Sequence, residues 1–174
     1  MAEFICGIQQ VGIGTNNLEK DWSWYRKAFS MDISVFVDEA EAPLMTQYTG
    51  NEVQNRVAAL ALNMQGGGGF EIWQYKSRTP VKANFQINLG DLGFLAVRMK
   101  TKNAESAYAE LKSLGVHALT QVEENPAGNK HFYVQDPAGN WFNVVEAGTY
   151  FKDEQNPTGG VFGAVIGVSN MDKS

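Results

Sequence analysis

One stretch of sequence, typical of a strand that enters a helix, occurs three times in this chain. Residues 11–20 carry the first copy, residues 166–173 repeat it almost residue for residue, and residues 94–103 carry a related version. Internal repetition constrains a fold strongly, because each copy of the repeat forms the same structural unit. We therefore expect two complete units and the beginning of a third, in a chain that is a piece of a longer protein.

Composition excludes several classes of protein. The chain has 174 residues, enough for one good core, and a net charge of −5 with interspersed signs, which argues against a nucleic-acid partner. No stretch approaches the roughly 20 apolar residues that cross a membrane, so we expect no membrane partner. Cys6 is the single cysteine and lies in an apolar run, which favours a buried, inert thiol. Since the N-terminus also lacks the features of a signal peptide, we predict a cytoplasmic location.

The first unit is predicted to contain a strand, a helix and three further strands. Alternation, helical spacing and turn residues place these elements at residues 4–14, 18–29, 32–38, 56–64 and 70–76. Residues 40–55, between the second and third strands, are predicted to be a loop. A phosphate loop would end in Gly-Lys-Ser or Gly-Lys-Thr and lead into a helix. The glycines at 66–69 are instead followed by a predicted strand, so they favour a hairpin turn.

The second unit follows a linker at residues 77–92 and repeats the same order. Its predicted elements are residues 92–99, 104–114, 116–124, 130–135 and 141–147. The turn between the last two strands is Asp136-Pro137-Ala138-Gly139-Asn140, in which proline presets one dihedral angle and glycine accepts a positive one. Residues 151–160 are polar and rich in helix breakers, and are predicted to be a linker. Residues 161–174 are predicted to be the first strand of a further, truncated unit.

These motifs together resemble the vicinal oxygen chelate superfamily, which includes glyoxalase I, bleomycin-resistance proteins and extradiol dioxygenases. The resemblance covers residues 4–150, as one domain of two modules at about 4–76 and 92–150, and its most specific motif is the Asp-Pro-Ala-Gly-Asn turn. It implies an α+β fold in which paired βαβββ modules form an open, curved eight-stranded barrel. The ligand of such a protein is expected on the concave side.

The resemblance also implies a divalent metal held by four side chains, one from each of the first and last strands of both modules. The matching positions in this chain are Gln10, Glu71, Phe94 and Asn143. They include one carboxylate and no imidazole, whereas zinc, iron and nickel prefer nitrogen or thiolate ligands beside carboxylate. We therefore expect no metal at this position and no other cofactor.

Strand alternation places Glu71, Trp73 and Tyr75 on one face, and it groups Trp141 with Asn143 in the same way. His131 and Tyr133 also share a face of their strand. An aromatic cup with a few polar groups is typical of a small-molecule site. The candidate ligand-binding residues are Gln10, Trp73, Tyr75, Phe94, His131, Tyr133, Trp141 and Asn143. In the alternative interpretation, the two tryptophans simply fill a small barrel.

Glu71 is the candidate catalytic residue. A carboxylate among aromatic rings can act as a general acid or base. It can equally pair with Arg56 or Arg98 in a structural role, or be the relic of a metal site. The sequence leaves these three alternatives open.

Two classes of function follow from the sequence. The first is a glyoxalase- or bleomycin-resistance-like binding domain with a degenerate metal site, whose ligand is an aromatic or amphipathic metabolite or antibiotic. The second is the N-terminal, non-metal domain of a two-domain lyase or ring-cleaving dioxygenase with its active site in a missing C-terminal half. Gly163 stands where the metal-binding histidine of that half is expected, which disfavours the dioxygenase. We expect residues 161–168 to pair with a sheet edge of their own domain or of a second copy in a homodimer.

Overall fold

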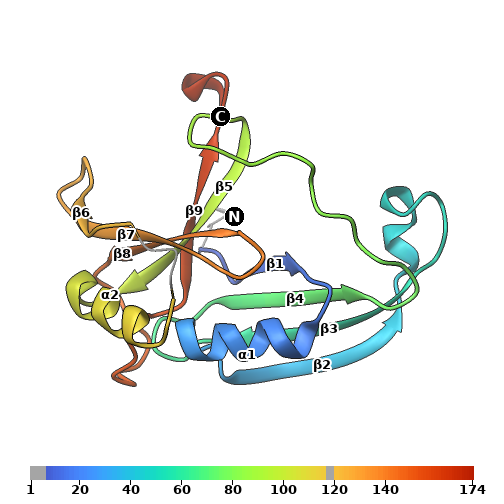
Figure 1. Cartoon of the computed structure of the whole chain (residues 1–174), viewed down its shortest axis with the longest axis horizontal. Helices are drawn as coiled ribbons and strands as arrows, with labels where there is room; N and C mark the ends of the chain where they lie inside the picture. The colour runs from blue at the N-terminus through green and yellow to red at the C-terminus, as the bar shows by residue number, and fades with distance from the viewer. Residues whose placement is uncertain (1–6, 117–119) are drawn as a thin grey trace, which may run out of the picture.

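A computed structural model describes residues 7–116 and 120–174, so Cys6 and the first residues of the predicted domain lie outside the described residues. The described residues form two β-sheets, each with one α-helix on it (Figure 1). The first module contains β1 (Gln10–Gly14), α1 (Leu18–Phe29), β2 (Ile33–Glu41), the 3-10 helix η1 (Pro43–Tyr48), β3 (Asn55–Leu62) and β4 (Gly69–Tyr75). The second contains β5 (Gly93–Thr101), α2 (Ala104–Ser113), β6 (Glu123–Glu124), β7 (Lys130–Gln135) and β8 (Trp141–Glu146). The strand β9 (Val161–Gly167) and the 3-10 helix η2 (Met171–Lys173) follow.

The strand orders confirm the predicted α+β fold of repeated modules. The first sheet has the order β1-β4-β3-β2, and the second has the order β6-β7-β8-β5-β9. In each module the first strand runs parallel to the last, β1 beside β4 and β5 beside β8, and the other pairs are antiparallel. The sheets are separate and curved, and they do not close into a barrel. The predicted loop at 40–55 contains η1, and β2 extends to Glu41, three residues beyond the predicted end of the strand.

The three copies of the strand-to-helix opening have the same local geometry. Asn17, Asn103 and Asn170 each precede a helix with φ angles of −151°, −150° and −154°. Each side chain accepts a hydrogen bond from a backbone N–H in the first turn, which supplies one of the donors that a helix N-terminus leaves unpaired. The recurring asparagine thus caps α1, α2 and η2.

A cluster of aromatic rings joins the two modules. Phe29 of α1, Phe70 of β4 and Phe142 of β8 meet with ring centroids 4.8–6.1 Å apart, and none of them is more than 1% exposed. The same core contains Ile72 of the first sheet and Val144 of the second. The helix-covered faces of both sheets therefore bury one common core, and the opposite faces are left for other uses.

The Asp-Pro-Ala-Gly-Asn turn is fixed to this core by its aspartate. The carboxylate of Asp136 accepts hydrogen bonds from the backbone N–H groups of Ala138 and Asn140, and from the Asn140 side chain. It also accepts one from the hydroxyl of Tyr25, 2.6 Å away on α1. Both Asp136 and Tyr25 are at most 5% exposed, so the bond between the modules lies in the interior.

The segment after β8 is held against the first module. Gln65, which is fully buried in the β3–β4 turn, donates to the backbone carbonyls of Asn156 and Thr158 and accepts from the N–H groups of Glu154 and Asn156. The strand β9 then pairs antiparallel with β5, with Gly167 opposite Gly93 and Val161 opposite Met99. The predicted linker is therefore an ordered connection, and β9 covers one edge of the second sheet.

No helix in the described part of the chain is both long enough and apolar enough to cross a membrane.

We expect the Tyr25→Phe variant to lose stability, because it removes the hydroxyl that donates a hydrogen bond to Asp136 inside the core. The free energy of unfolding, measured by urea denaturation at pH 7, is predicted to fall by about 1–3 kcal/mol. Burial, with the nearby Asp136 carboxylate adding to it, raises the pKa of Tyr25 well above its usual value. This group therefore stabilises the fold below the pKa of an unfolded tyrosine, about 10, and the contribution is lost as the pH rises above it.

The same titrations repeated at pH 9–11 check this pH dependence. The unaltered protein is expected to lose more stability over this range than the Tyr25→Phe variant does. Parallel losses in both proteins would contradict the assignment to Tyr25.

Candidate functional site

The face of the first sheet that points away from α1 carries Glu71, Trp73 and Tyr75, as strand alternation predicts. Phe70 and Ile72, on the other face, are fully buried beneath the helix. The Trp73 and Tyr75 rings lie 6.0 Å apart in an edge-on arrangement. These three side chains are only half-buried, so this open face can contact a ligand.

Glu71 is joined to Gln10, the other predicted site residue on this sheet. The Gln10 amide Nε2 donates a hydrogen bond of 2.6 Å to Glu71 Oε2. Gly12 and Gly14 of β1 lie opposite Glu71 and Trp73, and a Cβ atom at either glycine would meet nothing within 4 Å. The two glycines therefore leave open space beside the carboxylate and the indole.

The described residues form no ion pair with Glu71. Arg56, one of the two partners considered from the sequence, pairs with Asp38 at 2.7 Å. Arg98, the other, lies over the Phe162 ring at 5.0 Å. The structure therefore offers no support for Glu71 as one half of a structural ion pair, and its carboxylate stays available on the open face.

The second sheet groups the other predicted residues on its own open face. The rings of His131 and Tyr133 lie 5.6 Å apart, and those of Tyr133 and Trp141 lie 5.9 Å apart. Asn143 Nδ2 is 2.9 Å from His131 Nδ1, so the Asn143 amide can donate a hydrogen bond to this ring nitrogen. Burial raises the pKa of Tyr133, and the Arg98 guanidinium partly offsets this rise.

The residues at the family's four metal positions do not fit a transition metal. Gln10 and Glu71 hydrogen-bond to each other, and Phe94 has no donor atom. Asn143 is only 4% exposed, and its amide nitrogen lies near both His131 and the carbonyl oxygen of Phe132. Within residues 7–116 and 120–174, no group of three or more His, Cys, Asp or Glu side chains could hold a metal ion.

A solvent-open cavity of about 1310 Å³ lies between the modules. Its walls are residues 11–17, which run from β1 to the start of α1, residues 94–97 of β5, and Gln135 with residues 137–142 around the Asp136 turn. Residues 80–87 of the linker complete it, and Figure 1 shows this segment running from the end of β4 across to β5. Of the predicted site residues, Phe94 and Trp141 line this cavity.

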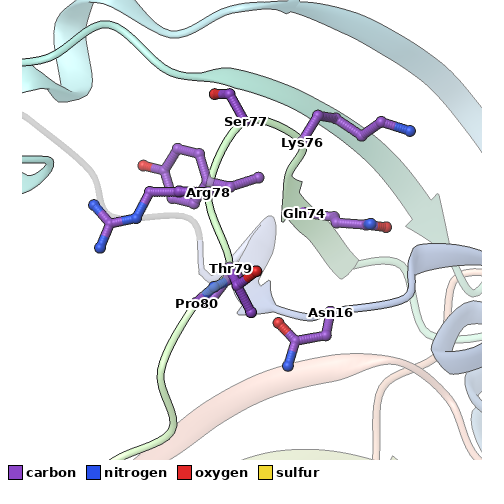
Figure 2. A pocket seen from close by; sticks show the side chains of 8 residues that line it. Asn16, Gln74, Lys76, Ser77, Arg78, Thr79 and Pro80 are labelled. Atoms are coloured by element: carbon purple, nitrogen blue, oxygen red, sulfur yellow. The ribbon is translucent and has the colours of Figure 1, made fainter.

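A second hollow of about 540 Å³ adjoins the first, since Asn16 and Pro80 line both. Tyr75 is the predicted site residue in this hollow. Its other walls carry two basic side chains and no acidic one, and Figure 2 shows Lys76 and Arg78 extending to opposite sides of the segment that follows β4. This end of the site therefore has a positive charge.

The structure thus divides the predicted residues between two surfaces. Gln10, Glu71, Trp73 and Tyr75 share the open face of the first sheet, and His131, Tyr133, Trp141 and Asn143 share that of the second. Among the described residues, no hydrogen bond or aromatic contact joins the two groups directly. The cavity between the modules is lined by Trp141 of the second group, and on the side of the first sheet by Gly12 and Gly14, the strand neighbours of Glu71 and Trp73.

Sequence reasoning missed Arg78 and assigned Arg56 only as a partner of Glu71. Arg56 stands opposite Tyr75 in the β3–β4 pairing and stacks over Trp73 instead, with 5.1 Å between the guanidinium carbon and the ring centroid. The register of the hairpin would have placed Arg56 on this face. The contact with Trp73 depends on side-chain packing, which the sequence does not specify.

Comparison with known proteins confirms the resemblance seen in the sequence. A family model described as Glyoxalase/Bleomycin resistance protein/Dioxygenase superfamily matches residues 7–144. No protein of curated function matches the sequence significantly.

Solved structures share the fold at low sequence identity. A glyoxalase family protein from Bacillus cereus is 15% identical with a TM-score of 0.64, covering 83% of this chain and 95% of its own. A glyoxalase I mutant from Zea mays is 14% identical with a TM-score of 0.53, over 82% of this chain and 46% of its own. A glyoxalase family protein from Enterococcus faecalis is 17% identical with a TM-score of 0.51, and the match covers 83% of this chain and 100% of that protein's chain. At such identities the likeness shows the fold alone.

We expect Glu71→Gln to change the stability of the fold little. The carboxylate is half-buried and its hydrogen-bond partner is a neutral amide, so the free energy of unfolding should stay within about 1 kcal/mol of the unaltered protein. Thermal and urea denaturation measure this difference. Glu71→Leu, which leaves the Gln10 amide without its acceptor, serves as the comparison and should cost more. If Glu71→Gln lowered the free energy of unfolding by more than about 3 kcal/mol, the negative charge of Glu71 would instead have a structural role.

Proposed function

The chain belongs to the glyoxalase/bleomycin resistance protein/dioxygenase superfamily, and we propose that it is a small-molecule-binding domain that works without a metal. The observation that carries this proposal is the cavity of about 1310 Å³ between the modules. Ligand sites in proteins typically measure about 300–1,000 Å³, so the cavity has room for a ligand of drug size.

The proposed ligand is an aromatic or amphipathic metabolite or antibiotic. The cavity walls include the rings of Phe85, Phe94 and Trp141 together with polar groups at Asn16 and Asn140. Apolar walls with a few polar anchors are the usual composition of sites for such molecules. Trp73 and Tyr75, on the adjoining open face, extend the aromatic surface that a planar ligand can contact.

The donor groups support binding without a metal. The four family positions offer one carboxylate, two amides and a phenyl ring, and both amides have hydrogen-bond partners within their own sheets. Recognition in our proposal therefore relies on hydrogen bonds and ring contacts. If the domain catalyses a reaction, we propose Glu71 as its general acid or base.

A second candidate function rests on the third strand-to-helix opening. The Asn170 cap has the same geometry as the caps of α1 and α2, which supports a further module after β9. In that case this domain is the non-metal part of a larger lyase or dioxygenase relative. The cytoplasmic location and a homodimer likewise stay predictions.

Binding can be tested with N-phenyl-1-naphthylamine, a neutral aromatic amphiphile whose fluorescence rises in apolar sites. We expect saturable binding, weakened about fivefold to tenfold in Phe94→Ser because that variant removes a ring from the cavity wall. Leu92→Ser is the matched control, since Leu92 is 70% exposed, lies two residues earlier and does not line the cavity. Equal affinities in all three proteins, or no saturable binding, would contradict the proposal.

Removal of metals should leave this binding unchanged. We expect elemental analysis of the gently purified protein to find far less than one zinc, nickel or iron per chain. Treatment with EDTA should alter the affinity for N-phenyl-1-naphthylamine by less than about twofold, because no metal takes part in our proposal. A stoichiometric metal whose loss abolishes binding would overturn metal independence.

A further inference from the structure

Two glycines alternate with apolar residues along β1, and neither the backbone nor the packing requires them. Gly12 and Gly14 have no φ angle in the left-handed region, so other residues could adopt their conformation. A Cβ atom at either position would meet nothing within 4 Å. Glycine inside a strand weakens it, and it often marks a place where a ligand approaches the backbone closely. Both residues are exposed, and both line the cavity between the modules.

The same stretch of β1 forms a free edge of the first sheet. In the described part of the chain, β1 is the last strand on its side of the sheet and pairs with β4 alone. Gln9 and Thr15, on either side of β1, form their backbone hydrogen bonds with β4. Because the residues of a strand alternate between its two sides, those with even numbers point their N–H and C=O groups away from β4. Gly12 and Gly14 therefore present backbone donors and acceptors at this edge.

The cavity extends along this edge. Residues 11–14 all line it, including Val11 and Ile13, whose side chains lie on the opposite face of the strand from the two glycine positions. A hollow that touches both faces of an edge strand also reaches the backbone groups between them. Phe94 and Trp141 line the same cavity. Backbone hydrogen-bonding groups and aromatic rings are thus available to one ligand.

The surroundings of the edge favour a small molecule over a further strand. Residues 80–87 of the connecting segment and residues 137–142 around the Asp136 turn are walls of the same cavity. Lys82 Nζ donates a hydrogen bond of 2.6 Å to the carbonyl of Ala138 and so joins these two walls. A strand of a partner protein needs a long stretch of free edge, whereas a planar molecule needs one donor and one acceptor.

We infer that the free edge of β1 binds a planar aromatic lactam, a cyclic amide, through the backbone of Gly12 and Gly14. The lactam N–H donates to a carbonyl of this edge, and its C=O accepts from a neighbouring N–H, as a pairing strand would. The ring of the ligand packs on Phe94 and Trp141. Side chains at residues 12 and 14 would keep the ring away from these backbone groups. This inference rests on the proposed function and specifies the chemical class of its ligand.

The test compares 2-quinolone with coumarin by isothermal titration calorimetry. Coumarin has the same shape, but it carries a ring oxygen in place of the lactam N–H. We expect the unaltered protein to bind 2-quinolone about tenfold more tightly, because bound coumarin leaves a carbonyl of the edge without a donor.

Gly12→Val and Gly14→Val should remove this preference without loss of stability. Both positions have room for a Cβ atom and valine is favoured in strands, so the variants should unfold at the same temperature or higher. Gly148→Val is the matched control, because a Cβ atom there also meets nothing within 4 Å and Gly148 does not line the cavity. It should keep the preference of the unaltered protein. If a valine variant unfolds, the comparison of 2-quinolone with coumarin in the unaltered protein still decides.

Equal binding of 2-quinolone and coumarin by the unaltered protein, or no binding of 2-quinolone, would overturn the inference. A preference that persists in both folded valine variants would overturn it as well. So would sedimentation that shows a dimer of the unaltered protein and monomers of both valine variants, since a second copy would then occupy the edge. If N-phenyl-1-naphthylamine still binds in these cases, only this inference fails. If that neutral probe does not bind, the proposed function fails.

Discussion

The hydrogen bond between Tyr25 and Asp136 holds the two modules in register. Asp136 is buried, and its two oxygens accept from four donors, three of them in its own turn and the fourth on α1. A buried carboxylate is stable only when its oxygens are satisfied, so the turn and the helix have to keep this geometry together. The most specific motif of the sequence, Asp-Pro-Ala-Gly-Asn, thus has a structural role: it joins the second module to the helix of the first.

This junction determines which faces remain for a ligand. Phe29, Phe70 and Phe142 pack beside the bond, so both sheets turn their helix-covered faces toward one core. The opposite faces keep their half-buried polar and aromatic side chains, and the cavity forms where β1 and β5 pass the Asp136 turn. The position of the site is therefore a consequence of how the core is shared.

Much of this arrangement could be predicted from the sequence, because it depends on local patterns. Alternation along β4 and β7 placed Glu71 with Trp73 and His131 with Tyr133, and asparagine caps marked the helix starts. Contacts between distant segments could not be predicted in this way. The stacking of Arg56 on Trp73 depends on packing across strands, and the choice of β5 as the partner of β9 depends on which sheet edge is free. The sequence likewise gave no sign that Gln65 would hold the segment after β8.

A set of family positions that contains no imidazole is compatible with this fold, because the connection between the modules does not pass through Gln10, Glu71 or Asn143. In the superfamily that the sequence resembles, the metal draws ligands from both modules. Here the remaining polar groups bond within their own sheets, Gln10 to Glu71 in the first and Asn143 to His131 in the second. The modules are joined instead by the aromatic core and by Tyr25 and Asp136. The two open faces are therefore free to differ in chemistry, and one can hold a carboxylate and arginines while the other holds an imidazole and a phenol.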